Sequence, residues 1–228
     1  MKFLIWDLPT RLFHWSLAFS VILAFGLAQF VEKETPLFFL HVVFGVLSGL
    51  LLLWRILWGF FGSKHSRWRS LWFSPKLIIQ YFKNVISGKG EYFSGHNPGG
   101  SIVILALLSS IGITVITGIL NPQAEIFENL HEFFPFVVLV LVVSHILGVL
   151  LASRMHNENY VLSMFTGMKT AKKNESISHS SKWAALIMVM LVFGTWAYFI
   201  KGFDRNNALF TAPGTNWTFQ IGEPSIEN

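Results

Sequence analysis

The segment from Glu125 to Arg154 constrains the fold most, because it is a largely apolar run that carries two histidines. His131 and His145 lie fourteen residues apart, which on an α-helix is almost four turns. Their rings therefore point within about 40° of each other and lie about 21 Å apart along the axis. A bilayer core is about 30 Å thick, so one face of one helix places an imidazole near each membrane side. Polar groups inside a membrane are functional candidates, and two in register suggest two stacked redox centres.

The composition is that of an integral membrane protein. Of the 228 residues, 53% are hydrophobic and only 13% are charged, unlike a soluble globular domain. The five runs that are long enough to span a bilayer cover residues 12–31, 37–60, 99–120, 132–152 and 183–200. The chain has no cysteine, which excludes disulfides, cysteine-held iron–sulfur clusters and covalently attached c-type haem.

The basic residues indicate the orientation. Of the 17 Lys and Arg residues, two precede the first run, six lie in the 2–3 connection and five in the 4–5 connection, whereas three lie on the opposite side. The positive-inside rule then predicts a multi-pass protein of the bacterial inner membrane with a cytoplasmic N-terminus and a periplasmic C-terminus. The same distribution argues against nucleic-acid binding as the reason for the net charge of +5.

The expected outer face is acidic, with eight acidic and three basic residues and so a net charge of −5. This charge favours either the solubility of short loops or the docking of a basic soluble partner, whose association rate it would raise. Residues 75–87 in the 2–3 connection have apolar residues at helical spacing and polar residues opposite. They predict an amphipathic helix on the inner membrane surface, or one packed on the cytoplasmic end of the bundle. The tail, 201–228, is expected to be irregular or to bind a partner.

Four histidines sort by depth into two pairs. His14 and His145 fall near the cytoplasmic side of the apolar runs, and His41 and His131 fall near the outer side. Two imidazoles from neighbouring helices can ligate one haem iron axially. A lone membrane histidine is more simply explained by an interhelical hydrogen bond. A His/His/carboxylate metal site is the other alternative, although Glu132, beside His131, is the nearest carboxylate in this run.

Other residues could complete such a site. Arg11 and Arg55 are candidate partners of haem propionates, or cationic membrane anchors. His96, in the turn SGHNPGG, could donate to a quinone carbonyl or contact a propionate, or it could stabilise the turn. Small residues near the histidines would leave room for a porphyrin, or for close helix packing; these are Gly45, Gly49 and Gly148. The remaining histidines are expected on the surface, namely His65, His156 and His179.

At this point several segments resemble a known family. The start WDLPTRLFHWSLA, the block HVVFGVLSGLLLLWRILWGFFG, the turn GHNPGG and the H-x13-H run are similar to the bacterial cytochrome b561 family, and most to its branch of b-type cytochrome subunits of nickel-dependent hydrogenases. The resemblance covers residues 3–170. It implies an all-α, four-helix transmembrane bundle that holds two b haems within 1–170, with His14 and His145 on the cytoplasmic-side haem and His41 and His131 on the outer one. Residues 171–228 depart from the four-helix pattern by a basic linker, a fifth helix at about 183–200 and an outer tail.

The sequence therefore predicts a di-haem cytochrome b that transfers electrons between a periplasmic redox protein and the membrane quinone pool. The partner would be a hydrogenase small subunit or a c-type cytochrome. One alternative is a stand-alone superoxide:quinone oxidoreductase, which the acidic outer face disfavours because superoxide is an anion. Another is a transporter with a histidine proton relay, which would be colourless when purified. A third is an anchoring subunit with structural haems.

Overall fold

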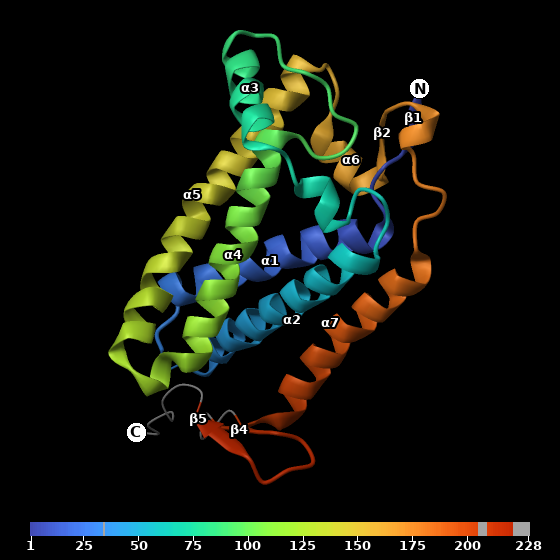
Figure 1. Ribbon diagram of the computed structural model, residues 1–228. Coiled ribbons are helices and arrows are strands. Elements are labelled where there is room, and N and C mark those ends of the chain that lie inside the picture. Colours follow the sequence, from blue (N-terminus) through green and yellow to red (C-terminus); the bar gives the residue numbers. More distant parts are fainter. Residues whose placement is uncertain (34, 205–208, 221–228) are drawn as a thin grey trace. The chain divides into compact units, whose positions relative to one another are not determined.

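The computed structural model describes residues 1–33, 35–204 and 209–220. Within them, five helices are long and apolar enough to cross a membrane, so the predicted all-α membrane fold with five spans is confirmed (Figure 1). These helices are α1 (Leu8–Phe30), α2 (Phe39–Phe61), α4 (Pro98–Leu120), α5 (Glu125–Met155) and α7 (Lys182–Gly202). An α-helix pairs most of its backbone polar groups within itself, which suits the interior of a bilayer.

The other elements are short. Two further α-helices are α3 (Pro75–Ile86) and α6 (Tyr160–Thr166), and the 3₁₀ helices are η1 (Pro36–Phe38), η2 (Trp68–Leu71), η3 (Asn121–Gln123) and η4 (Lys173–Glu175). The strands are β1 (Lys2–Leu4), β2 (Met168–Thr170), β3 (Phe203–Asp204), β4 (Leu209–Thr211) and β5 (Thr218–Gln220). The chain forms two compact units, the first from residues 1–12 and 52–182 and the second from residues 13–51 and 183–228.

The first unit is built on a helical hairpin. Helices α4 and α5 lie side by side and are joined through η3 (Figure 1). Helix α4 starts in the turn GHNPGG, whose residues favour a helix N-terminus. Pro98 occupies the first turn, and the Asn97 side chain accepts a hydrogen bond from the Gly100 N–H at 2.7 Å. A proline, Pro135, lies inside α5. Since proline has no N–H, the carbonyl of His131 loses its usual partner within the helix.

The Asp7 side chain joins three segments of the first unit through hydrogen bonds. Its side chain is completely buried and caps α1 by accepting a hydrogen bond from the Thr10 N–H at 2.8 Å. The same carboxylate accepts from the indole of Trp58, at the end of α2, at 3.1 Å and from the Ser66 hydroxyl at 3.3 Å. One carboxylate therefore joins the start of α1, the end of α2 and the turn that follows α2.

The second unit ends in a small sheet, so the expectation of an irregular tail was wrong. Strands β3, β4 and β5 pair antiparallel in that order. The turn between β4 and β5 contains Gly214 at φ +82°, which glycine adopts without steric cost. Aromatic and apolar side chains from the sheet and α7 bury the first turns of α2; this core is Phe39, Val43, Phe199, Phe210 and Ala212. Phe203 stacks on Phe39, with ring centroids 3.6 Å apart.

Some residues of the predicted outer charge pattern fall outside the described part of the chain. These are Glu34, Arg205, Glu223 and Glu227.

We expect Asp7→Ala to lower the free energy of unfolding by about 1–3 kcal/mol, because it removes a helix cap and the acceptor of the half-buried Trp58 indole N–H. Thermal unfolding in detergent measures this as a lower Tm. Glu91→Ala, which removes an exposed carboxylate of the same unit, is the matched control. Equal Tm values for the two variants would show that Asp7 does not hold these segments together.

Candidate functional site

His41 is oriented by the helix that precedes it. Its Nδ1 lies 2.8 Å from the Ala24 carbonyl oxygen in α1, and the Phe38 ring stacks on the imidazole at a centroid distance of 5.0 Å. A carbonyl oxygen can only accept a hydrogen bond, so Nδ1 carries the proton. The neutral ring then has its lone pair on Nε2, which is the nitrogen that can bind a metal.

His131 in the first unit shows the same arrangement. Its Nδ1 lies 2.9 Å from the carbonyl oxygen of Thr114 in α4, again 17 residues earlier in the chain. The ring also lies against Gly118, where a Cβ atom would be only 2.7 Å from Cε1 of His131. A larger residue at position 118 would displace the imidazole. Both expected outer-side histidines therefore present the same tautomer, each fixed by the carbonyl of the preceding membrane helix.

The two cytoplasmic-side candidates lie on α1 and α5. His14 is half-buried and packs edge-on against Trp15 at 4.8 Å, and His145 is half-buried on the helix that also carries His131. The second unit contains His14 and His41, and the first contains His131 and His145. Each predicted pair joins one histidine from each unit, so the pairing stays a prediction.

The two candidate arginines differ in their surroundings. Arg11 donates from its NH1 to the carbonyl of Phe165, at the end of α6. Arg55 is only 5% exposed, and its guanidinium lies 4.7 Å from the centre of the Trp68 ring. Its NH1 is buried and makes no hydrogen bond to any described residue. Nε of Arg11 is likewise buried without a described partner. A buried cationic donor without an acceptor is costly, so both arginines suit an added anionic group, and Arg55 is the more deeply buried of the two.

His96 lies in a polar cluster with His65 and Trp6. The Trp6 ring packs edge-on against both imidazoles, at 4.9 Å from His96 and 6.1 Å from His65. The expectation that His65 lies on the surface was wrong: it is 7% exposed, and its Nε2 donates to the Glu175 carbonyl at 2.7 Å. Gly95 permits this, because a Cβ atom there would be 2.5 Å from Nδ1 of His65. His156 is half-buried beside Tyr160, and His179 is exposed as predicted.

The hydrogen bonds of Ser70 define the tautomer of His96. The Ser70 hydroxyl donates to backbone carbonyls, with those of His65 and Arg67 at 2.8 and 2.7 Å. Nδ1 of His96, 3.3 Å from the same oxygen, is therefore the donor in that contact, and Nε2 is left as an acceptor. Burial, helped by the positive charges of Arg55, His65 and Lys169, lowers the pKa of His96 to about 3. The ring is neutral at physiological pH.

Lys169 stabilises the loop that contains His96. It is 2% exposed, its Nζ donates to the Phe93 carbonyl at 2.7 Å, and it lies 4.0 Å from the centre of the Tyr160 ring. Burial lowers the pKa of Lys169 to about 8, although the charge of Glu158 acts in the opposite direction. An ammonium group held by a carbonyl and an aromatic ring keeps most of its charge at neutral pH.

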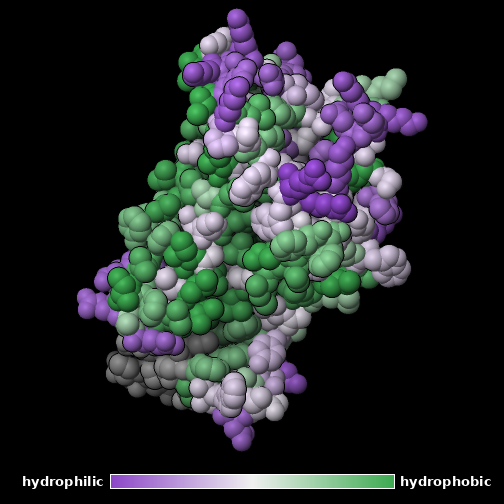
Figure 2. All heavy atoms as spheres, in the orientation of Figure 1, coloured by the Kyte–Doolittle hydropathy of each residue, from purple (hydrophilic) through white to green (hydrophobic). Residues whose placement is uncertain are grey.

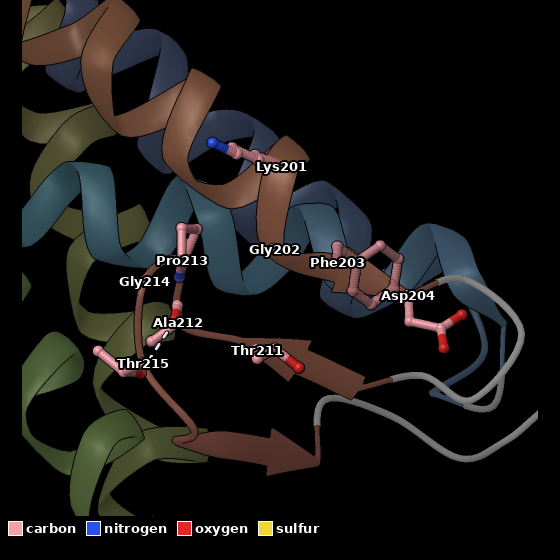
Figure 3. Close-up of a pocket in the computed structure, with 9 residues that line it drawn as sticks. All are labelled: Lys201, Gly202, Phe203, Asp204, Thr211, Ala212, Pro213, Gly214 and Thr215. Carbon is pink, nitrogen blue, oxygen red and sulfur yellow. Dashed lines mark hydrogen bonds between the residues drawn. The ribbon is translucent and has the colours of Figure 1, made fainter.

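A cavity of about 350 Å³ lies at the end of α7 in the second unit. Backbone and small side chains of β4 and the following turn line it, and Lys201 and Asp204 extend in different directions (Figure 3). Nothing in it resembles a redox site. Within the described residues, no three His, Asp or Glu side chains gather as a metal site, so the predicted His/His/carboxylate alternative has no support in these ranges.

The five spans and the histidines at two depths are the features of a multi-pass membrane cytochrome. The family model for prokaryotic cytochrome b561 matches residues 5–167, and the chain belongs to that family. It is therefore a membrane cytochrome b of electron transport, and the resemblance seen in the sequence is confirmed.

Two relatives carry the same name, "Probable Ni/Fe-hydrogenase B-type cytochrome subunit". The one from Rhizobium leguminosarum bv. viciae is 21% identical over 217 residues, covering 75% of this chain and 90% of the relative. The one from Bradyrhizobium diazoefficiens is 20% identical over 209 residues, covering 72% and 84%. No solved structure matches the chain.

The family implies b-type haem, and the residues present fit that group. Metal-binding histidines characteristically donate their second ring nitrogen to a carbonyl or carboxylate, as His41 and His131 do. A Cβ atom at Gly45 or Gly148 would meet no described atom within 4 Å. Within its own unit, each of these glycines therefore leaves room beside a histidine-bearing helix. The sequence did not predict the carbonyls of Ala24 and Thr114 as partners, although each lies 17 residues before its histidine.

We expect acid to destabilise the protein through His96. Its pKa in the fold is below the ordinary 6.5, so between about pH 6.5 and 3 the unfolded chain binds a proton that the folded chain does not. The free energy of unfolding therefore falls as the pH falls through this range. His96→Gln, which cannot be protonated, should make the decline of Tm from about pH 7 to 5 shallower. His179→Gln, at an exposed site, is the control, and identical slopes for both variants would contradict the assignment.

Proposed function

We propose that this cytochrome transfers electrons across the bacterial inner membrane between a periplasmic redox protein and the quinone pool. It holds two b haems, one ligated by His14 and His145 near the cytoplasmic side and one by His41 and His131 near the outer side. The observation that carries the proposal is the shared tautomer of His41 and His131, which prepares Nε2 of both rings for iron. Bound haem supplies reversible one-electron transfer at its iron.

The protein contributes ligation and electrostatics. The carbonyls of Ala24 and Thr114 hold the two outer-side rings and increase the basicity of Nε2. Arg55, whose buried guanidinium has an unused donor, receives a haem propionate on the cytoplasmic side. Arg11, already bound to the Phe165 carbonyl, has a smaller part in propionate binding.

Quinone reacts near the cytoplasmic haem, with His96 as a contact. Because Nδ1 of His96 donates to Ser70, the neutral ring offers Nε2 as an acceptor. It therefore accepts a hydrogen bond from a quinol hydroxyl, and donation to a quinone carbonyl does not fit this tautomer. The Trp6 ring and the Lys169–Phe93 contact keep the loop in place.

The partner lies on the periplasmic side. The excess of lysine and arginine in the 2–3 and 4–5 connections supports a cytoplasmic N-terminus and a periplasmic C-terminus. The names of the two relatives support a hydrogenase as the partner, with a c-type cytochrome as the alternative. An acidic outer face suits a soluble partner with a basic docking surface.

The purified protein should contain two b-type haems per chain. His131→Ala should lose one haem and His14→Ala the other, because each haem depends on a separate pair of ligands. A reduced-minus-oxidised spectrum with haem and protein quantified together measures both effects. His179→Ala is the control and should keep both haems. A colourless wild-type protein would contradict the proposal and favour the transporter, and one haem per chain would contradict the pairing.

His96→Ala should slow electron exchange with a soluble quinone analogue and leave both haem spectra unchanged. The physical reason is the loss of an acceptor at the quinone, at a residue that is not an iron ligand. Stopped-flow absorbance measures the rate, with His179→Ala as the control. A wild-type rate in His96→Ala would remove His96 from the quinone site.

A further inference from the structure

Helix α3 presents three different faces. Tyr81 and Val85 point toward the first unit: a Cβ atom at Gly99, the second residue of α4, would lie 2.8 Å from Tyr81, and one at Gly90 would lie 3.8 Å from Val85. A second face is apolar and exposed, with Ile79 and Ile86 exposed by 58 and 86%. Phe82, which is 46% exposed, lies at the edge of this face, and its ring tip would be 3.4 Å from a Cβ atom at Gly99. At 100° per residue these three side chains fall within about 60° of one another.

The third face is basic and adjoins the apolar one. Lys76 and Lys83 are both exposed and, seven residues apart, project within about 20° of each other. Lys83 follows Ile79 by four residues and so lies about 40° around the helix from the apolar stripe. An exposed apolar stripe edged by lysines is the pattern of a helix that lies in the interface of an anionic membrane.

Helix α3 lies at one end of a membrane span. Tyr81 and Phe82 contact the start of α4, which is itself long and apolar enough to cross a membrane. Figure 2 shows hydrophilic side chains gathered at the end of the first unit where α3 lies, and hydrophobic ones over α4 and α5. The exposed stripe is therefore at the level where lipid headgroups meet the apolar helices.

We propose that α3 is a binding surface for anionic phospholipid in the leaflet at the N-terminal end of α4. Ile79, Phe82 and Ile86 insert at the level of the headgroups, and Lys76 and Lys83 bind lipid phosphates. The anionic lipid surface attracts basic residues within about a Debye length, roughly 8 Å at physiological salt. The proposal does not depend on the haem ligands or on the orientation of the chain.

The absence of native cysteine makes a direct test possible. Ile86→Cys on the stripe and Gln80→Cys on the exposed polar face are each labelled with bimane in the full-length protein, in nanodiscs with and without phosphatidylglycerol. With this lipid present, brominated acyl chains should quench most of the fluorescence at position 86 and little at position 80. Acrylamide dissolved in the water should quench most of the fluorescence at position 80 and little at position 86. Lys76→Gln with Lys83→Gln, or high salt, should weaken the lipid quenching at position 86.

Three results would overturn the proposal. Equal acrylamide quenching at positions 86 and 80 would show that the stripe faces water. Protection of position 86 from both quenchers would show that protein, such as a second copy of the chain, covers the stripe. Lipid quenching that is the same without phosphatidylglycerol and in the double lysine variant would show that the surface does not select anionic lipid.

Discussion

The hydrogen bond from a histidine ring to the carbonyl of the preceding helix is the interaction on which the proposed chemistry depends. Inside a bilayer no water is available to bind a polar side chain, so an imidazole needs a partner from the protein. His41 and His131 find it in Ala24 and Thr114. The bond has a second effect, because it fixes the proton on Nδ1 and leaves Nε2 able to accept. The same contact thus lowers the cost of burial and sets the tautomer that the proposed haem ligation requires.

At the polar end of the first unit, buried polar groups also find partners within the protein. Asp7 is buried but accepts three hydrogen bonds, and Lys169 is buried but held by a carbonyl and a tyrosine ring. His96 meets the requirement by remaining neutral. Among the charged side chains, Arg11 and Arg55 depart from this rule, since each has a buried nitrogen with no described partner. Buried cationic donors without a partner are what a site for an anionic group would produce.

The C-terminal region supports the N-terminal end of α2. The fifth helix and its small sheet bury Phe39 and Val43, which flank His41 on the first turns of that helix. The histidine itself rests on Phe38 and on the Ala24 carbonyl. The segment beyond the residues matched by the family model is therefore joined to one of the candidate ligand helices in a packed core, and it is not a loose appendage.

The sequence by itself determined the membrane spans and the start of α4, and it predicts the depth of the four histidines. These features are local. Apolar runs, the Asn97–Pro98 signal and the position of a residue along a helix depend on adjacent residues in the chain and not on distant segments. The tertiary structure decided which carbonyls His41 and His131 bind, that His65 is buried and that residues 203–204, 209–211 and 218–220 form paired strands. Those outcomes depend on contacts between segments distant in the chain, and hydropathy does not report which distant segment a side chain will meet.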